Sequence, residues 1–281
     1  MLSGRLVLTR APRPILQPFV EMLWGIDATS DSPPALVRRE HVLPTGQMHI
    51  AFRYFGGPLR LFEDAADTDG HFVGDAVVGG ARDVHYIRDV STPACSVGAQ
   101  LGPGAAEALF GISADELAGR HTPLDDLWGR DVVWMREQLM EPAMLHERIT
   151  ILESILAARL TMRRAIHPAV PQALEQLRVT SSIRRIVQAS GYSHRTLISL
   201  FRRSVGLTPK QYVRVLRFQR VLETVSVAEK TSLVDVAMEA GYSDQAHFSR
   251  EFRAFAGVTP SEYRRESPER PHHLLVNGGA R

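Results

Sequence analysis

The sequence predicts an α+β protein: a β-rich, barrel- or sandwich-like first domain with trailing helices, then an all-α second domain. Three observations predict this division. Up to Leu101, short apolar runs alternate with Gly, Pro and Asp turns, which is typical of strands. From Gly104 onward, apolar residues recur at helical spacing. In the second half, two spaced motifs recur about 50 residues later, which indicates a duplicated helical unit.

We therefore expect three parts along the chain. Residues 1–165 form a sensor or dimerisation domain, and residues 169–266 form a domain of two helix–turn–helix units joined by a long helix. Residues 267–281 form a flexible tail. Prolines three residues apart within 167–171 predict the linker between the domains, because they interrupt a continuous helix.

The composition is that of a folded protein with a hydrophobic core. Of 281 residues, 44% are hydrophobic and 23% charged, which excludes disorder over most of the length. The first residues lack the apolar core of a signal peptide, and no apolar run approaches the roughly 18 residues that span a bilayer. We therefore expect a cytoplasmic protein without membrane contact. Cys95 is the single cysteine, which excludes an intramolecular disulfide and a zinc site of several thiolates.

Charge divides the chain into an acidic and a basic part. Residues 1–168 hold 16 Arg against 21 Asp and Glu, whereas residues 169–266 hold 15 Lys and Arg against 9 Asp and Glu. Within 176–222 there are ten basic residues and no acidic one. Because both signs normally alternate on a solvated surface, this folded basic segment favours binding of a polyanion over a plain solvated face.

The first domain is expected to contain strands followed by helices. The strand candidates are 48–54, 59–62, 71–78, 84–87 and 96–101. Helices are expected at 105–110 and 114–117, the second with a capping box of Ser113 and Glu116. Residues 144–164 are amphipathic, and their heptad-like spacing predicts either a short dimerisation helix or a helix packed on its own domain.

Candidate sites in the first domain are few. The aromatic residues that would line an effector pocket, unless they form a plain core, are Trp24, Phe52, Tyr54, Phe55 and Phe72. The histidines of this domain lack the spacing of a metal site, so we predict no metal and no cofactor. Cys95 lies in an apolar strand, which predicts an inert buried thiol.

The repeat in the second half consists of two motifs. GYS at 191–193 recurs at 241–243, and FRRSVGLTP at 201–209 recurs as FRAFAGVTP at 252–260. Each copy therefore has the pattern of helix, tight turn and helix. Gly191 and Gly241 supply the positive φ that the turn requires. Ser193 and Ser243 are placed to cap the next helix.

The second helix of each copy is expected over 194–204 and 244–255, and it ends at Gly206 or Gly257. Thr208 and Thr259 then begin a further helix with Pro at its first position, where no backbone donor is needed. The first of these further helices, over 209–225, links the two copies.

Residues 169–266 resemble the DNA-binding domain of the AraC/XylS family of bacterial transcriptional regulators. The segment GYSDQAHFSREFRAFAGVTPSEYR is close to that family's signature. The resemblance implies two helix–turn–helix units on a linking helix of roughly 25 Å. Since major-groove faces recur about every 34 Å, both recognition helices are expected to enter adjacent turns of double-stranded DNA. Residues 43–52 and 97–129 resemble an uncharacterised domain that precedes such units, which implies sensing or dimerisation.

The resemblance also implies which side chains contact DNA. The base-facing positions are Arg195, Ile198, Ser199, Gln245, Ala246, Ser249 and Arg250. Among them, arginine and glutamine form bidentate bonds to guanine and adenine, so Arg195, Gln245 and Arg250 are the expected readers. The expected phosphate contacts are Arg184, Arg185, Arg202, Arg203, Lys210, Arg214 and Arg253. The first copy should supply most phosphate affinity, because residues 223–266 hold five basic and eight acidic residues.

The sequence thus predicts a sequence-specific transcriptional regulator that is not an enzyme. Its expected partners are double-stranded DNA, a small-molecule effector and a second copy of the chain. The alternative is an enzyme whose β-barrel is fused to a DNA-targeting module, but the common catalytic motifs are absent from the sequence. A repair protein would need a zinc-held thiolate that one cysteine cannot provide, and a non-specific architectural protein would not need readers such as Gln245 and Arg250.

Overall fold

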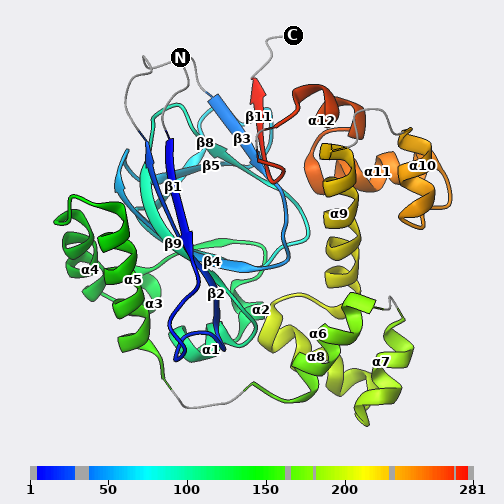
Figure 1. Ribbon diagram of the computed structural model, residues 1–281, viewed down its shortest axis with the longest axis horizontal. Coiled ribbons are helices and arrows are strands. Elements are labelled where there is room, and N and C mark those ends of the chain that lie inside the picture. The colour runs from blue at the N-terminus through cyan, green and yellow to red at the C-terminus, as the bar shows by residue number, and fades with distance from the viewer. Residues whose placement is uncertain are drawn as a thin grey trace.

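Two antiparallel sheets form the first domain of the computed structural model (Figure 1). The structure describes residues 5–28, 38–161, 166–179, 182–227, 232–268 and 270–277. The first sheet has the order β1 (Arg5–Arg10), β2 (Val20–Ala28), β9 (Cys95–Leu101), β4 (Met48–Phe55), β7 (Ala76–Gly79), β10 (His121–Pro123). The second has the order β11 (His273–Asn277), β3 (Arg38–Val42), β8 (Tyr86–Asp89), β5 (Leu59–Phe62), β6 (His71–Gly74).

The helices lie around these sheets and form two groups along the chain (Figure 1). One group follows the strands: α1 (Ala105–Phe110), α2 (Ala114–Leu117), α3 (Asp125–Trp128), α4 (Asp131–Met140) and α5 (Leu145–Arg159). The other group forms the second domain: α6 (Ala169–Val179), α7 (Ile183–Ser190), α8 (His194–Val205), α9 (Pro209–Val227), α10 (Leu233–Glu239), α11 (Gln245–Ala256) and α12 (Pro260–Glu266). The predicted α+β class is confirmed. Among the described residues, no helix has the length and apolarity needed to cross a membrane.

The two faces of β4 show why the sheets pack as they do. Met48, Ile50 and Phe52 alternate along the strand and are buried in the main core. Ala51, between them, packs instead with Leu59 of the second sheet. A strand with apolar residues on both faces is covered on both sides, here by helices and by the opposite sheet.

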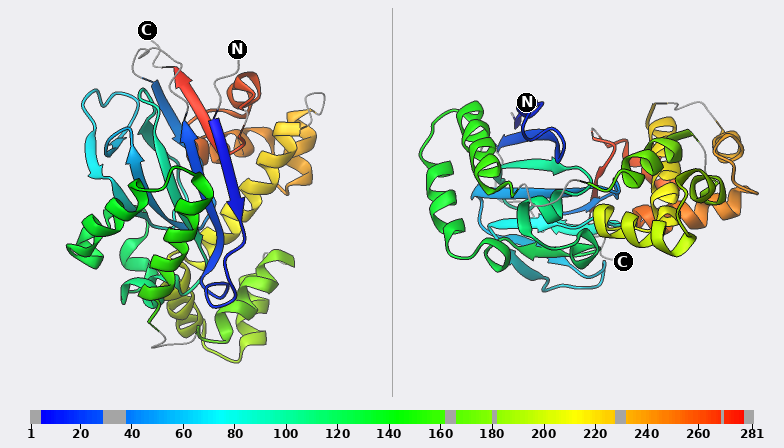
Figure 2. Two further views of the ribbon diagram at one scale, coloured as in Figure 1. Left: turned by 60° about the vertical axis from the view of Figure 1, so that its left-hand side comes forward. Right: turned by 90° about the horizontal axis from the view of Figure 1, so that it is seen from below.

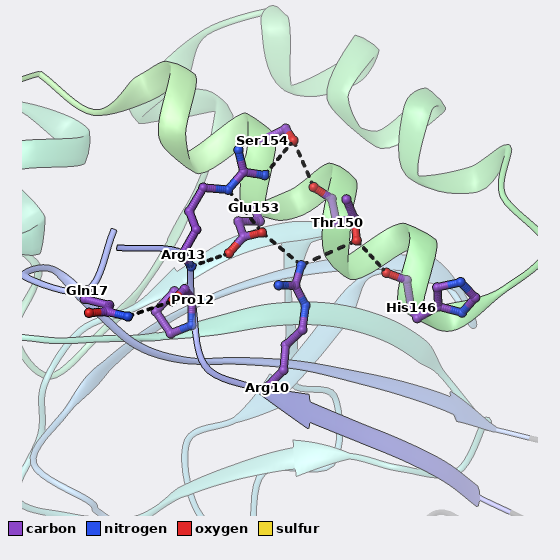
Figure 3. Close-up of polar contacts among 8 residues, drawn as sticks. All are labelled: Arg10, Pro12, Arg13, Gln17, His146, Thr150, Glu153 and Ser154. Carbon is purple, nitrogen blue, oxygen red and sulfur yellow. Dashed lines mark hydrogen bonds and ion pairs between the residues drawn. The ribbon is translucent and has the colours of Figure 1, made fainter. Parts of the chain in front are cut away.

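Helix α5 packs on its own domain. Leu145 and Ile149 lie directly over Gly25 of β2, where an added Cβ would meet their side chains within 3.1 Å. The buried carboxylate of Glu153 accepts hydrogen bonds from Arg10 Nη2 at 3.0 Å and from the backbone N–H of Arg13 at 2.6 Å (Figure 3). Of the two interpretations of residues 144–164, packing on the domain is the one the structure shows; residues 162–165 lie outside the described part.

The tail is not loose over its whole length. Residues 273–277, predicted to belong to a flexible tail, form β11 and pair with β3 (Figure 2). Buried Glu40 of β3 accepts hydrogen bonds from Arg88 Nε at 2.5 Å and from His273 Nδ1 at 3.1 Å. Burial alone would raise the pKa of Glu40, but these partners lower it to about 2. The flexible-tail prediction is therefore corrected for 273–277, while 278–281 lie outside the described residues.

The strand predictions were accurate where the sequence alternates and incomplete elsewhere. The candidate 71–78 is two strands, β6 and β7, which belong to different sheets, and β8 begins at Tyr86 instead of residue 84. Strands β1, β2, β3 and β10 were not predicted. The helices α1 and α2 match their predicted bounds, and the capping box of Ser113 and Glu116 is present.

The hydrophobic cores divide the second domain in an unexpected way. One cluster joins α6, α7 and α8 around Leu197 and Phe201. The core around Phe248 and Phe252 of α11 is instead continuous with that of the first domain. The boundaries 1–165 and 169–266 stay predictions, because packing alone does not separate the second half of the helical domain from the sheets.

Candidate nucleic-acid interface

Helices α7 and α8 form a first helix–turn–helix unit, called unit 1 here. Gly191 ends α7 with φ +70, the left-handed conformation expected from the sequence. Ser193 Oγ then accepts a hydrogen bond from the backbone N–H of Thr196 at 3.1 Å and caps α8. The structure confirms both predictions for unit 1.

Helices α10 and α11 form unit 2, in which one predicted cap differs. Gly241 has φ +76, as expected. The cap of α11 is Asp244, whose carboxylate accepts a hydrogen bond from the backbone N–H of His247 at 2.7 Å, and Ser243 lies one residue before it. The predicted Ser243 cap was therefore wrong by one residue. The reason is that the ionised carboxylate of Asp244 is a stronger acceptor than the hydroxyl of Ser243. This bond and a second one from Ser243 lower the pKa of Asp244.

Both recognition helices end alike and are followed by the same capping pattern. Gly206 and Gly257 have φ +88 and +77 and close the last turns of α8 and α11. Thr208 and Gln211 cap α9 reciprocally, with bonds of 3.2 Å and 3.0 Å between side chains and backbone. Thr259 caps α12 in the same way. Helix α9 stands between the two units, with unit 1 at one end and unit 2 near the other (Figure 1).

The predicted base-reading residues lie where a groove could reach them. Arg195 and Ser199 on α8, and Gln245, Ala246 and Arg250 on α11, are exposed. Ile198 and Ser249 are half-buried. The two recognition helices therefore present their first turns to solvent, as major-groove readers do. The assignment of individual readers stays a prediction.

The predicted phosphate contacts fall into two groups. Arg184, Arg185, Lys210 and Arg253 are exposed. Arg202 and Arg203 are also exposed but are paired within the protein, with Asp115 at 3.8 Å and with Glu107, and half-buried Arg214 is paired with Glu251. Two of these pairs join unit 1 to the acidic first domain. Asp115 and Glu107 could not be predicted as partners, because they lie far from Arg202 and Arg203 along the chain.

Glu251 is a structural residue that was not predicted from the sequence. It lies on α11 and is 9% exposed. Its carboxylate accepts hydrogen bonds from Arg214 Nε at 2.9 Å and from Arg217, both on α9. Burial acts to raise its pKa, but Arg214, Tyr242 and Arg217 keep it below the ordinary value. This network fixes recognition helix α11 against the linking helix.

The candidate pocket residues are not brought together. Phe52 is fully buried in the core, whereas Phe55 and Phe72 are 57% and 67% exposed. Trp24 packs over Gly98, and Tyr54 donates a hydrogen bond to Asp27. The five side chains therefore do not line one pocket. Cys95 is buried, as expected, and no group of three or more potential metal ligands occurs among the described residues.

Two segments of the chain are similar to known protein families. Residues 186–266 match a helix-turn-helix domain, and residues 8–123 match a domain of unknown function (DUF6597). The chain is 39% identical over 83 residues to an HTH-type transcriptional regulator of Escherichia coli (strain K12), covering 30% of this chain and 34% of that protein. It is 33% identical over 85 residues to the HTH-type transcriptional activator AarP of Providencia stuartii, covering 30% and 61%.

Two solved structures were also matched. An AraC-type DNA-binding domain from Chromobacterium violaceum is 26% identical, with a TM-score of 0.34 and coverage of 36% of this chain and 94% of that chain. ToxT from Vibrio cholerae is 9% identical, with a TM-score of 0.45 and coverage of 95% and 100%. The chain spans about a third of the length of the first curated relatives. Residues 186–266 are thus similar to the helix-turn-helix domains of transcriptional regulators, and residues 8–123 to the domain of unknown function DUF6597.

Proposed function

We propose that this protein is a sequence-specific DNA-binding transcriptional regulator whose helices α8 and α11 read adjacent turns of the major groove. One observation carries the proposal: the helix–turn–helix is duplicated, and both recognition helices expose their first turns. Arg195, Gln245 and Arg250 are the proposed base readers. The exposed cations Arg184, Arg185, Lys210 and Arg253 are the proposed phosphate contacts. The helix–turn–helix match also disfavours the enzyme alternative.

Selection of bound fragments from random DNA by the whole protein tests the proposal. We expect an enriched sequence of two half-sites about one helical turn apart. Arg250→Ala should relax the preference at one base pair, by about 1–3 kcal/mol, whereas Arg265→Ala, an exposed arginine on α12, should leave it unchanged. Absence of any enriched sequence would overturn the function, and an unchanged preference in Arg250→Ala would overturn that reader.

The first domain is proposed to modulate this activity through an effector or a second copy of the chain. The first domain's acidic balance and its ion pairs with unit 1 support a modulating role. Repeating the selection with metabolite mixtures tests for an effector. Light scattering at several concentrations tests for a dimer, and a monomer at every concentration would exclude it.

A further inference from the structure

The first domain contacts the two recognition helices at equivalent places in the repeat. At the end of α8, the carbonyl of Ser204 accepts a hydrogen bond from the backbone N–H of Gly104 at 2.8 Å. At the end of α11, the carbonyl of Phe255 accepts one from the backbone N–H of His85 at 3.0 Å. Ser204 and Phe255 correspond in the two copies, since both lie two residues before the terminal glycine. The last carbonyls of a helix have no partner within the helix, so they are available for such contacts.

A histidine pair strengthens the contact to unit 2. His41 Nδ1 lies 2.9 Å from the carbonyl of Ala256, and this distance assigns the ring proton to Nδ1 as donor. The ring of His41 stacks on that of His85 with centroids 4.5 Å apart. Both histidines belong to the second sheet or its adjoining loop, so unit 2 is docked on the sheet itself.

The terminal glycines show how closely the surfaces approach. A Cβ at Gly206 would meet the carbonyl oxygen of Ala114 at 3.1 Å, and one at Gly257 would meet His85 Nε2 at 2.6 Å. At Gly191 and Gly241, which have similar positive φ, a Cβ would meet nothing within 4 Å. The tight fit is therefore specific to the two helix ends that face the first domain.

This docking leaves the reading ends of the helices open. In α8, Arg195 is exposed whereas Val205 is 6% exposed. In α11, Gln245 is exposed whereas Ala256 is fully buried. The first domain thus supports both recognition helices from behind and does not cover their first turns. Seen from below, the sheets and the helical domain lie side by side (Figure 2).

We propose that the first domain is a template that fixes the separation and rotation of the two recognition helices, and so selects the spacing between half-sites in DNA. Gly104, His41 and His85 are the positioning residues. The inference rests on the proposed function. The two units have separate cores and are otherwise joined through α9, so the first domain is what holds them in register. Shifting a half-site by one base pair changes both its distance and its angle around the duplex, so units held in register bind one spacing best.

The test compares Gly257→Ala with Gly241→Ala in the whole protein. Both add a methyl group at nearly the same left-handed φ, +77 and +76, but only the first forces His41 and His85 apart from α11. Amide hydrogen exchange at His85 should become at least about tenfold faster in Gly257→Ala alone. On DNA in which the half-site spacing is varied, the affinity ratio between the best spacing and its neighbours should fall about fivefold in Gly257→Ala. This change corresponds to the loss of one or two hydrogen bonds.

Two further measurements separate the outcomes. His41→Phe removes the donor to Ala256 and keeps a flat ring on His85. It should weaken the spacing preference in the same way, and it takes the place of Gly257→Ala if that variant does not fold. The template would be overturned if a variant exchanged its His85 amide faster but kept the spacing preference unchanged. It would also be overturned if the His85 amide were unprotected in the unaltered protein. If the unaltered protein enriches no DNA sequence, the proposed function itself fails.

Discussion

Units 1 and 2 derive from one repeated pattern but are stabilised differently. Unit 1 has its own small core and lies in a segment, 176–222, of ten basic residues without an acidic one. Unit 2 shares the core of the first domain and holds a buried carboxylate, Glu251, where unit 1 has Leu200. The repeat thus preserves helix ends and turns, while packing and charge have become specialised. This difference supports the proposal that unit 1 supplies most phosphate affinity, while unit 2 is held in a fixed position.

The largest expected effect comes from the equivalent phenylalanines Phe201 and Phe252. Both are fully buried, so replacing either with alanine should destabilise its unit by about 3–5 kcal/mol. The ring centroids of Phe252 and Tyr263 are 5.7 Å apart. The hydroxyl of Tyr263 donates a hydrogen bond to the carbonyl of Pro271, just before β11. Hydrogen exchange should therefore quicken in β3 and β11 for Phe252→Ala, but only in α6–α8 for Phe201→Ala. Identical exchange patterns would contradict the division of the cores.

The buried carboxylate of unit 2 should have a smaller effect. Glu251→Gln leaves Arg214 and Arg217 without their charged acceptor, and breaking a buried pair is destabilising. Because these arginines are 38% and 30% exposed, we expect about 2 kcal/mol, less than for a fully buried pair. The matched control is Glu266→Gln, whose exposed pair with Arg265 should contribute under about 0.5 kcal/mol. Urea unfolding measures both, and equal losses would refute the role of Glu251.

Acid should release unit 2 before unit 1. Burial lowers the pKa of His85 to about 4, helped by the neighbouring charge of His41, and burial also lowers the pKa of His41. Because the pKa of a buried histidine is lowered in the folded protein, its neutral form stabilises the docked contact fully above the ordinary pKa of about 6.5. This stability is lost as pH falls from about 6.5 towards about 4, by at most about 1.4 kcal/mol per pH unit. Unit 1 is docked through a backbone bond and arginine–carboxylate pairs instead.

The measurement must be local, because burial also lowers the pKa of His49, His121 and His273 in the sheets and of His272 just before β11. Amide exchange at His85 and at Gly104 in the same sample reports the two docking sites separately. Between pH 7 and 5, protection should be lost at His85 first, and His85→Phe should reduce the difference. Simultaneous loss at both amides would show that the first domain unfolds as a whole.

The sequence predicted the helical domain well because its signals are local. Caps, turn glycines and apolar spacing occur within a few residues, so α8 and α9 begin where expected and end within two residues of the prediction. Strand pairing is not local: β11 pairs with β3, with His273 opposite Val42, across most of the chain. Hence the tail was predicted to be loose.

One missed site residue did leave a signal. Glu251 shares the inward face of α11 with Phe248, Phe252 and Phe255, at spacings of three and four residues. A carboxylate on an apolar face indicates a buried partner, and Arg214 and Arg217 occur three residues apart on the linking helix. The docking of the helix ends left no such signal, because backbone carbonyls accept those bonds whatever the side chain.

The smallest expected effect separates two kinds of arginine within unit 1. Arg184 is exposed, so Arg184→Ala should make the salt dependence of DNA binding shallower by about one unit, since one fewer counterion is released. Arg203 Nε lies 2.9 Å from Glu107 Oε1, so its charge is already balanced and Arg203→Ala should change the slope much less. The slope of log affinity against log salt for each variant measures the difference. Equal slopes would mean that DNA displaces Glu107 from Arg203, and the docking of unit 1 would then open on binding while that of unit 2 persists.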